Sequence, residues 1–189
     1  YSLLLKSHSS TSERISFYPE LIKIIKSLKP NSVLDLGCGL NPIAISPHFK
    51  KVKYFASDIN EKDLLLVQNF FDRKKIPGKT FVSDLRYIEK NLPKADLCLI
   101  FKVVDVIDPA GKKRGAITKN LLVKIPCKKI LVSFSTKKLS GKKMNHPERE
   151  WFERILNFMK LPFEKFYSDN EIFYMIEKSK PQYPRIFLV

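Results

Sequence analysis

Short apolar runs alternate along this chain with longer segments in which apolar residues recur at helical spacing. Five segments have the strand pattern: 32–37, 52–59, 79–85, the beginning of 95–108, and 128–136. Several of these runs are almost continuously apolar, which is typical of strands covered on both faces. The pattern therefore predicts a mostly parallel sheet with helices on both sides.

The intervening segments predict the helices. Residues 13–28 and 147–161 are amphipathic, 42–49 predicts a short helix with Pro42 in its first turn, and 60–74 predicts a helix capped by Asn60. The last two apolar segments, 162–169 and 171–178, are close enough to form an antiparallel hairpin. The expected fold is therefore α/β, with a doubly wound, mostly parallel, seven-stranded sheet that ends in this hairpin.

The chain divides into three parts on this prediction. Residues 1–31 form a helical lead that covers the sheet, 32–178 form the sheet domain, and 179–189 form a C-terminal tail. A chain of 189 residues with 44% apolar content is long enough to bury one core.

Charge adds a candidate partner. Lys and Arg number 35 against 19 for Asp and Glu, which gives a formal net charge of +16. Surfaces of high-temperature proteins are also rich in lysine, but they usually carry a matching number of acids. The surplus therefore favours a polyanion, and nucleic acid in particular.

The three cysteines, Cys38, Cys98 and Cys127, are far apart and odd in number. This pattern indicates a reducing compartment, so a cytoplasmic protein is expected. No histidine has metal-ligand spacing with them, so no metal site is predicted. No apolar run approaches the roughly 20 residues of a membrane span, and no membrane association is expected.

The stretch SVLDLGCGLNPIAIS, residues 32–46, carries the first chemical signal. Gly37 and Gly39 after an apolar strand allow the backbone to approach a ligand closely. A dinucleotide site would place its third glycine at position 42, and Pro42 is there. The turn therefore suits a nucleotide-like ligand without a pyrophosphate.

Acidic residues at successive strand ends define that ligand further. Asp58 lies 19 residues after Gly39, where a carboxylate accepts from ribose hydroxyls. Asp84 ends the next strand, where it can accept from an adenine amino group, and Asp35, inside the first motif, can help position an ammonium-bearing tail. Ribose, adenine and an amino-acid tail together describe S-adenosylmethionine, the predicted cofactor.

The motifs VLDLGCG, ASDIN and VSDL resemble the first three motifs of class I methyltransferases that depend on S-adenosylmethionine. This resemblance implies a Rossmann-like methyltransferase domain over residues 32–178. A narrower resemblance rests on HSSTSERISFYPEL, LGCGLNPIAI and SFSTKKLSGKK with a downstream WFE. These segments are similar to ribosomal RNA guanine-N7 methyltransferases of the aminoglycoside-resistance type, which act on the small subunit.

The resemblance implies that Arg14 lies near the methionine carboxylate of the cofactor. Family members carry a sizeable helical RNA-binding subdomain at the N-terminus, and only a few residues precede His8 here, so most of that subdomain is missing from this sequence. The full set of expected cofactor-binding residues is Arg14, Asp35, Gly37, Cys38, Gly39, Asn41, Pro42, Asp58, Ile59, Asp84, Leu85 and Phe101.

The choice of reaction follows partly from what the motifs lack. Exocyclic-amine methylation typically uses an Asn/Asp-Pro-Pro-aromatic loop after the fourth strand, and IFKVVDVIDP stands there. Cytosine-C5 methylation needs a cysteine nucleophile, but Cys127 is expected before the fifth strand, at the wrong end of the sheet. Guanine N7 carries a lone pair and needs no base, so no catalytic residue is required, and Lys102 is a candidate for positioning the target.

Ribose 2′-O-methylation is the main alternative, with Lys102 or Asp105, Lys137 and Glu177 as its candidate residues. A transfer RNA substrate, a small-molecule methyltransferase and a non-enzymatic RNA-binding module that kept the fold are further alternatives. Intact Gly37, Gly39, Asp58 and Asp84 favour an enzyme over the binding module.

Two basic loops follow the fourth and fifth strands at the ligand-binding edge, where they can contact phosphates. Their expected RNA-binding residues are Lys112, Lys113, Arg114, Lys137, Lys138, Lys142, Lys143 and Arg149. The expected partner is ribosomal RNA or the small ribosomal subunit, bound by a monomer.

Overall fold

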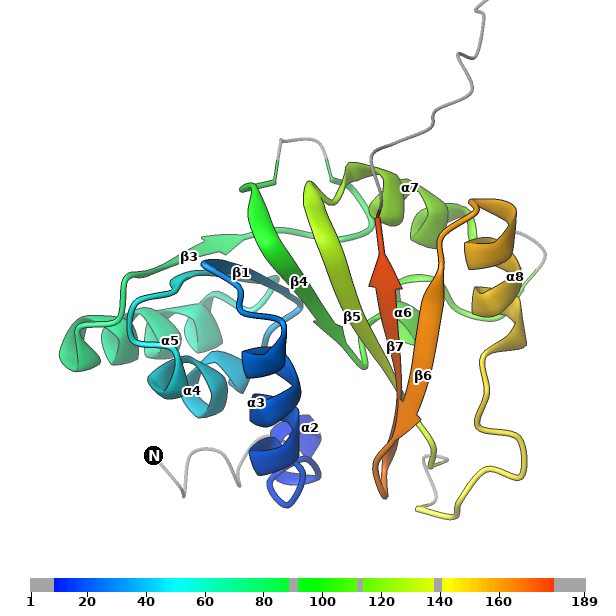
Figure 1. Ribbon diagram of the computed structural model, residues 1–189, viewed down its shortest axis with the longest axis horizontal. Coiled ribbons are helices and arrows are strands. Elements are labelled where there is room, and N and C mark those ends of the chain that lie inside the picture. Colours follow the sequence, from blue (N-terminus) through cyan, green and yellow to red (C-terminus); the bar gives the residue numbers. More distant parts are fainter. Residues whose placement is uncertain (1–8, 89–91, 112–113, 138–140, 179–189) are drawn as a thin grey trace, which may run out of the picture.

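The structure is a computed structural model that describes residues 9–88, 92–111, 114–137 and 141–178. Its centre is a seven-stranded sheet with the order β3-β2-β1-β4-β5-β7-β6 (Figure 1). The strands are β1 (Ser32–Leu36), β2 (Lys53–Asp58), β3 (Gly78–Val82), β4 (Ala95–Phe101), β5 (Cys127–Ser135), β6 (Phe163–Tyr167) and β7 (Glu171–Glu177). The predicted fold class is confirmed.

The first five strands are parallel, and β7 and β6 are antiparallel to their neighbours. The order reverses between β1 and β4, because the chain leaves β1 for β2 and β3 before it returns on the other side. Such a switch point opens a crevice at the carboxyl ends of the strands, where ligands bind. The glycine turn after β1 lies at this point.

Helices cover both faces of the sheet. They are α2 (Ser9–Ser12), α3 (Tyr18–Ser27), α4 (Asn41–Ile45), the 3-10 turn η1 (Ser46–His48), α5 (Glu61–Lys74), α6 (Val104–Ile107), α7 (Ala116–Lys124) and α8 (Glu150–Phe158). One core cluster packs α3, α4 and α5 on one face, and a second packs α6, α7 and α8 on the other. α5 and α8 lie at opposite ends of the molecule (Figure 1).

Alternation within each strand explains the two clusters. Val33 points into the first cluster and Leu34 into the second, as do Leu97 and Cys98 in β4. Side chains of a strand point alternately to its two faces, so a strand covered on both sides must be apolar throughout. This requirement produces the continuous apolar runs seen in the sequence.

Several local predictions are confirmed. The side chain of Asn60 caps α5 by accepting from the backbone N–H groups of Lys62 and Asp63. Phe152 and Ile155 of α8 are buried in the second cluster, and β6 and β7 form the expected hairpin.

The helix predicted over residues 13–28 is shorter than expected. Turns at 13–17 separate α2, which ends at Ser12, from α3, so α3 is the one helix within the predicted range. Pro19 explains the break, because proline lacks an N–H donor and is tolerated only in the first turn of a helix. The break places Arg14 in a turn rather than on a helix, and this directs it into the site described below.

The division of the chain at residues 31 and 178 stays a prediction. No helix within the described ranges is long and apolar enough to cross a membrane.

Candidate cofactor and methyl-transfer site

The turn after β1 has the backbone that its two glycines predict. Gly37 and Gly39 have φ values of 63° and 47°, in the left-handed region that favours glycine. A Cβ on Gly37 would lie 2.9 Å from a methyl carbon of Val103, so a side chain would not fit there. The Cys38 backbone N–H also donates to the Ser57 carbonyl at 2.9 Å, which fixes the turn to the end of β2.

Asp58 holds the glycine turn directly. Its carboxylate accepts from the backbone N–H of Gly39 at 2.8 Å and from that of Asn60 at 3.0 Å. A carboxylate oxygen has two lone pairs, so each oxygen keeps capacity for a further donor. The carboxylate of Asp58 is therefore fixed in place and still able to accept from vicinal hydroxyls of a ribose.

Asp84 lies beyond the end of its strand rather than at it. β3 ends at Val82, and Asp84 occupies the following turn, where its carboxylate pairs with the Arg86 guanidinium at 2.6 Å. The hydrogen bond from the Arg86 side chain lowers the pKa of Asp84. Leu85 beside it is buried, whereas Ile59 after Asp58 is exposed and free to cover a flat ring.

Asp35 is fully buried in the middle of β1. The Tyr54 hydroxyl donates to its Oδ2 at 2.8 Å, and its Oδ1 has no partner among the described residues. Burial raises the pKa of Asp35 to about 7, although the Tyr54 hydrogen bond and the charge of Arg14 oppose this rise. A buried carboxyl with one vacant acceptor is suited to a cationic group that enters from the site.

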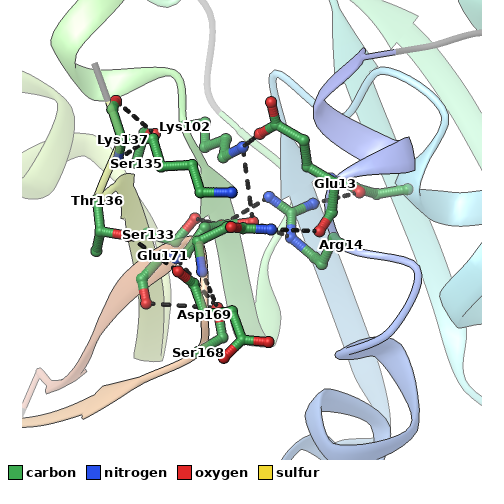
Figure 2. Close-up of polar contacts among 12 residues, drawn as sticks. Glu13, Arg14, Lys102, Ser133, Ser135, Thr136, Lys137, Ser168, Asp169 and Glu171 are labelled. Carbon is green, nitrogen blue, oxygen red and sulfur yellow. Dashed lines mark hydrogen bonds and ion pairs between the residues drawn. The ribbon is translucent and has the colours of Figure 1, made fainter. Parts of the chain in front are cut away.

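Arg14, in the turn before α3, forms an ion pair with Glu171 at the start of β7 (Figure 2). Its Nε and Nη2 donate to Oε1 and Oε2 of Glu171, each at 2.8 Å, and both side chains are 1% exposed. The guanidinium also lies over the Phe101 ring, 4.7 Å from its centroid. Burial opposes the charge of Arg14, but the ion pair with Glu171 more than compensates, and the pKa of Arg14 is raised.

Asn41 connects this ion pair to the glycine turn. Its Oδ1 accepts from Arg14 Nη1 and from the Tyr18 hydroxyl, both at 2.6 Å. Burial raises the pKa of Tyr18 to about 12, so the hydroxyl keeps its proton and serves as a donor. Asn41 begins α4 and Pro42 follows it in the first turn, which explains why this pair of residues follows the glycines.

Lys102 follows β4 directly and has the positive φ of 59° that such a sharp turn requires. Its ammonium group pairs with Glu13 and lies 3.9 Å from Glu171 (Figure 2). Lys102 therefore lies between two acids at the carboxyl ends of the parallel strands, where the glycine turn also lies. We call this end of the sheet the site edge.

The 2′-O alternative placed Glu177 in this group, and the structure corrects that prediction. β7 is antiparallel, so its last residue, Glu177, lies at the opposite edge, opposite Lys129 near the start of β5. Glu171, the first residue of β7, takes the position beside Lys102.

The turn between β6 and β7 fixes Glu171 and the lead segment together. The Ser133 hydroxyl donates to Glu171 Oε2 at 2.5 Å, and the Asn170 side-chain amide donates to the Glu13 carbonyl at 3.0 Å. Residues from β5, the β6–β7 turn and the N-terminal turn therefore meet at one point (Figure 2).

The basic loop after β5 begins as an extended arm. Lys137 and Lys143 form an isolated antiparallel bridge, and the Met144 N–H donates to the Thr136 carbonyl at 2.8 Å. Lys142 and Lys143 are exposed, whereas Lys138 lies outside the described residues, as do Lys112 and Lys113 of the other loop.

Arg149 has a different position from the one expected of a phosphate contact. It is buried, and its guanidinium donates to Asp105, to the Pro147 carbonyl and to the Ser135 carbonyl. With its donors used inside the protein, Arg149 organises the loop and does not present itself to RNA. Arg114 also pairs with Asp105, at 2.7 Å, but keeps partial exposure.

Neither Cys38 nor Cys127 is suited to act as a nucleophile at this edge. Burial raises the pKa of the Cys38 thiol well above its ordinary value, which opposes formation of the nucleophilic thiolate. Cys127 is the first residue of β5, at the opposite edge from the glycine turn. Within the described ranges, no group of three or more His, Cys, Asp or Glu residues is arranged to hold a metal ion.

Sequence reasoning missed four residues of this edge: Glu13, Tyr18, Tyr54 and Glu171. Glu171 had a usable signal, because it is an acid at the first position of an apolar strand in the predicted hairpin. Tyr18 and Tyr54 had none, since buried tyrosines with ordinary core spacing are common.

A family model described as ribosomal RNA methyltransferase (FmrO) matches residues 1–174 of the chain. A 16S rRNA (guanine(1405)-N(7))-methyltransferase of Micromonospora rosea is 30% identical in an alignment of 180 residues that covers 90% of this chain and 63% of that relative. An enzyme with the same description from Serratia marcescens is also 30% identical, over 93% of this chain and 69% of its own length. The chain thus spans about two thirds of the length of these relatives.

A solved structure agrees with the same relationship. The 16S rRNA methyltransferase RmtF, in complex with S-adenosyl-L-homocysteine, superposes with a TM-score of 0.78 and 25% identity. The match covers 93% of this chain and 67% of the RmtF chain.

Proposed function

The chain belongs to the family of ribosomal RNA methyltransferases of the FmrO type, and from this premise we propose that it methylates N7 of a guanine in small-subunit ribosomal RNA. The methyl donor is S-adenosylmethionine, in agreement with the S-adenosyl-L-homocysteine bound by RmtF. The observation that carries the proposal is the family match over residues 1–174, which includes every residue of the site edge.

Methyl transfer to N7 requires little of the protein beyond alignment of the reacting atoms. The N7 lone pair attacks the methyl carbon, a C–N bond forms, and the bond between carbon and the sulfonium sulfur breaks. The positive charge moves from sulfur to the guanine ring, and no proton has to be removed. Holding nucleophile, methyl and sulfur in line therefore supplies much of the rate enhancement.

The site edge offers a group for each part of the cofactor. Gly37 and Gly39 allow close approach of the nucleoside, and the fixed carboxylate of Asp58 accepts from its ribose. We expect Asp84 to accept from the adenine amino group and the vacant oxygen of Asp35 to accept from the ammonium.

Arg14 completes the set by binding the methionine carboxylate. Its guanidinium has five N–H donors, of which three have partners among the described residues, in Glu171 and Asn41. Two donors are left for an incoming carboxylate. The ion pair with Glu171 would hold Arg14 in this orientation before the cofactor arrives.

Ribose 2′-O-methylation is the second candidate, and the position of Lys102 favours it. That reaction needs a group that removes the hydroxyl proton, and Lys102, between Glu13 and Glu171, is the candidate for that role. Under the N7 proposal, Lys102 only orients the target base. Lys102→Met should then slow methyl transfer without abolishing it, whereas a 2′-O enzyme should lose activity completely.

The proposed substrate is 16S ribosomal RNA, either naked or within the small subunit. The two relatives named above carry that substrate in their descriptions. Exposed Lys142 and Lys143, beside the site edge, would contribute phosphate contacts. We further propose that the protein acts as a monomer in the cytoplasm, where its substrate is made.

The test uses radiolabelled S-adenosylmethionine with purified 30S subunits, naked 16S rRNA, 50S subunits and transfer RNA in parallel. Nucleosides from each labelled RNA are then identified by mass spectrometry. The proposal expects 7-methylguanosine in 16S rRNA and no label in the other RNAs. Label in transfer RNA or a 2′-O-methylated nucleoside would replace the proposal with one of its alternatives.

A further inference from the structure

A cavity of about 500 Å³ lies between α7 and α8, away from the cofactor groups. Its walls come from the loop before α7 and from the facing sides of the two helices. The lining residues are Ala110, Gly111, Arg114, Lys119, Trp151, Arg154, Ile155 and Phe158, and we call this the α7–α8 groove.

The groove is cationic and aromatic. Arg114, Lys119 and Arg154 line it, and none of its lining residues is an acid, although Glu150 outside the lining pairs with Arg154 at 3.5 Å. The Arg114 guanidinium lies 4.1 Å from the centroid of Trp151, and the Lys119 ammonium lies 4.8 Å from that of Phe158. Cations interleaved with aromatic rings are typical of surfaces that track a nucleic-acid backbone.

Two features of the wall point to a ligand rich in acceptors. Phe158 is 77% exposed, so its ring is open to a ligand that enters the groove. Trp151 Nε1 and Arg114 Nε have no acceptor among the described residues. A phosphodiester brings acceptor oxygens and negative charge, which this wall lacks.

Direct contacts connect the groove to the site edge. Asp105 accepts from Arg114 at 2.7 Å and from Arg149 at 3.0 Å, and Arg149 donates to the Ser135 carbonyl at the end of β5. The Arg149 side chain also contacts Met144, which follows the exposed lysines of the β5 loop. A chain of side-chain contacts therefore connects the groove to the loop after β5.

We propose that the α7–α8 groove binds the RNA backbone next to the methylated nucleotide, as a second RNA contact in addition to the β5 loop. This inference rests on the proposed function. The net charge of +16 supports it, since a polyanion is the expected partner of such a surface. Lys119 and Arg154 would each neutralise a phosphate, and the aromatic rings would contact the adjoining nucleotides.

The experiment compares two double variants that remove the same charges. Lys119→Gln/Arg154→Gln changes the groove, and Lys62→Gln/Arg73→Gln changes α5 at the opposite end of the molecule (Figure 1). Filter binding measures the affinity of each for a 16S rRNA transcript over a series of salt concentrations. Calorimetry with S-adenosylmethionine and thermal unfolding check that cofactor site and fold are intact.

The groove variant should bind RNA about tenfold more weakly, and its plot of log affinity against log salt should be shallower by roughly 1–2. The α5 variant should match the wild type in both respects. Equal behaviour of the two variants would overturn the proposal, and a groove that serves a protein partner would give that result. The wild type is also incubated with S-adenosylmethionine and the same transcript. Failure of the proposed function would leave that transcript without 7-methylguanosine, whereas failure of the groove proposal alone would not.

Discussion

Arg14 and Glu171 lie 157 residues apart in the chain and form a buried, two-pronged ion pair with both distances at 2.8 Å. This pair holds the turn at residues 13–17 against β7, the last strand in the chain. Asn41 and Ser133 add hydrogen bonds to the two partners, so the pair is also joined to the glycine turn and to β5.

Removing one charge of this pair should destabilise the fold. Glu171→Gln keeps the shape but leaves the Arg14 guanidinium buried without a counter-charge, at a cost of about 3–5 kcal/mol. Urea unfolding measures the loss. The double variant Arg14→Met/Glu171→Gln removes the uncompensated charge and should recover much of the stability. A single variant as stable as the wild type would show that the ion pair is not needed for folding.

Arg14 should also discriminate between ligands by their carboxylate. We expect Arg14→Lys, which keeps the positive charge, to lose about tenfold or more in affinity for S-adenosylmethionine. Lysine lacks the planar fork of N–H donors with which arginine pairs with a carboxylate. Affinity for 5′-methylthioadenosine, which has no amino-acid tail, should change little. Titration calorimetry with both ligands decides the matter. Equal losses would mean that Arg14 acts through the fold rather than through the carboxylate.

Asp58 is expected to contribute through its charge-assisted hydrogen bonds. Asp58→Ala should weaken S-adenosylmethionine binding by about 1.5–3 kcal/mol, since the ribose loses its acceptor and the Gly39 N–H loses its anchor. Asp96→Ala offers a matched control, because Asp96 also accepts from a backbone N–H, that of Asn31, at the opposite end of the strands. Calorimetry on both variants should show a loss only for Asp58→Ala, and unchanged affinity would remove Asp58 from the ribose role.

Asp35 should make stability depend on pH. Burial raises the pKa of its carboxyl to about 7 from 3.8, so the folded protein holds a proton that the unfolded chain has already released. The resulting stability is fully present below the unfolded pKa and is lost as pH rises through 7. The free energy of unfolding of the wild type relative to Asp35→Asn should therefore fall by on the order of 2 kcal/mol from about pH 5 to 8. Parallel pH profiles for the two proteins would contradict this account.

The fold was largely predictable from the sequence because each signal was local. Continuous apolar runs predicted the buried strands, and Asn60 predicted the start of α5. The start of α3 was harder to predict, because the apolar spacing continues from Ile15 through Pro19. Only the free-energy cost of a proline inside a helix decides where the helix begins.

The site was predictable where it follows a strand in sequence, as at Asp58, and less so where it depends on strand direction. Glu171 and Glu177 frame the same strand, and only the antiparallel placement of β7 brings the first of them to the site edge. Arg149 illustrates a second limit. A basic residue in a basic loop suggests solvent and phosphate, but its partners Asp105 and the Ser135 carbonyl come from other elements.

The central claim is methylation at guanine N7, and the chemistry of the product tests it most directly. Alkylation at N7 leaves a cationic, labile base, so treatment of the modified 16S rRNA with borohydride and then aniline should cut the chain at one guanine. Primer extension locates the cut, and RNA incubated without S-adenosylmethionine serves as the control. An RNA that resists this cleavage, but shows a single gap in its alkaline hydrolysis ladder, would contradict the account and establish ribose 2′-O-methylation.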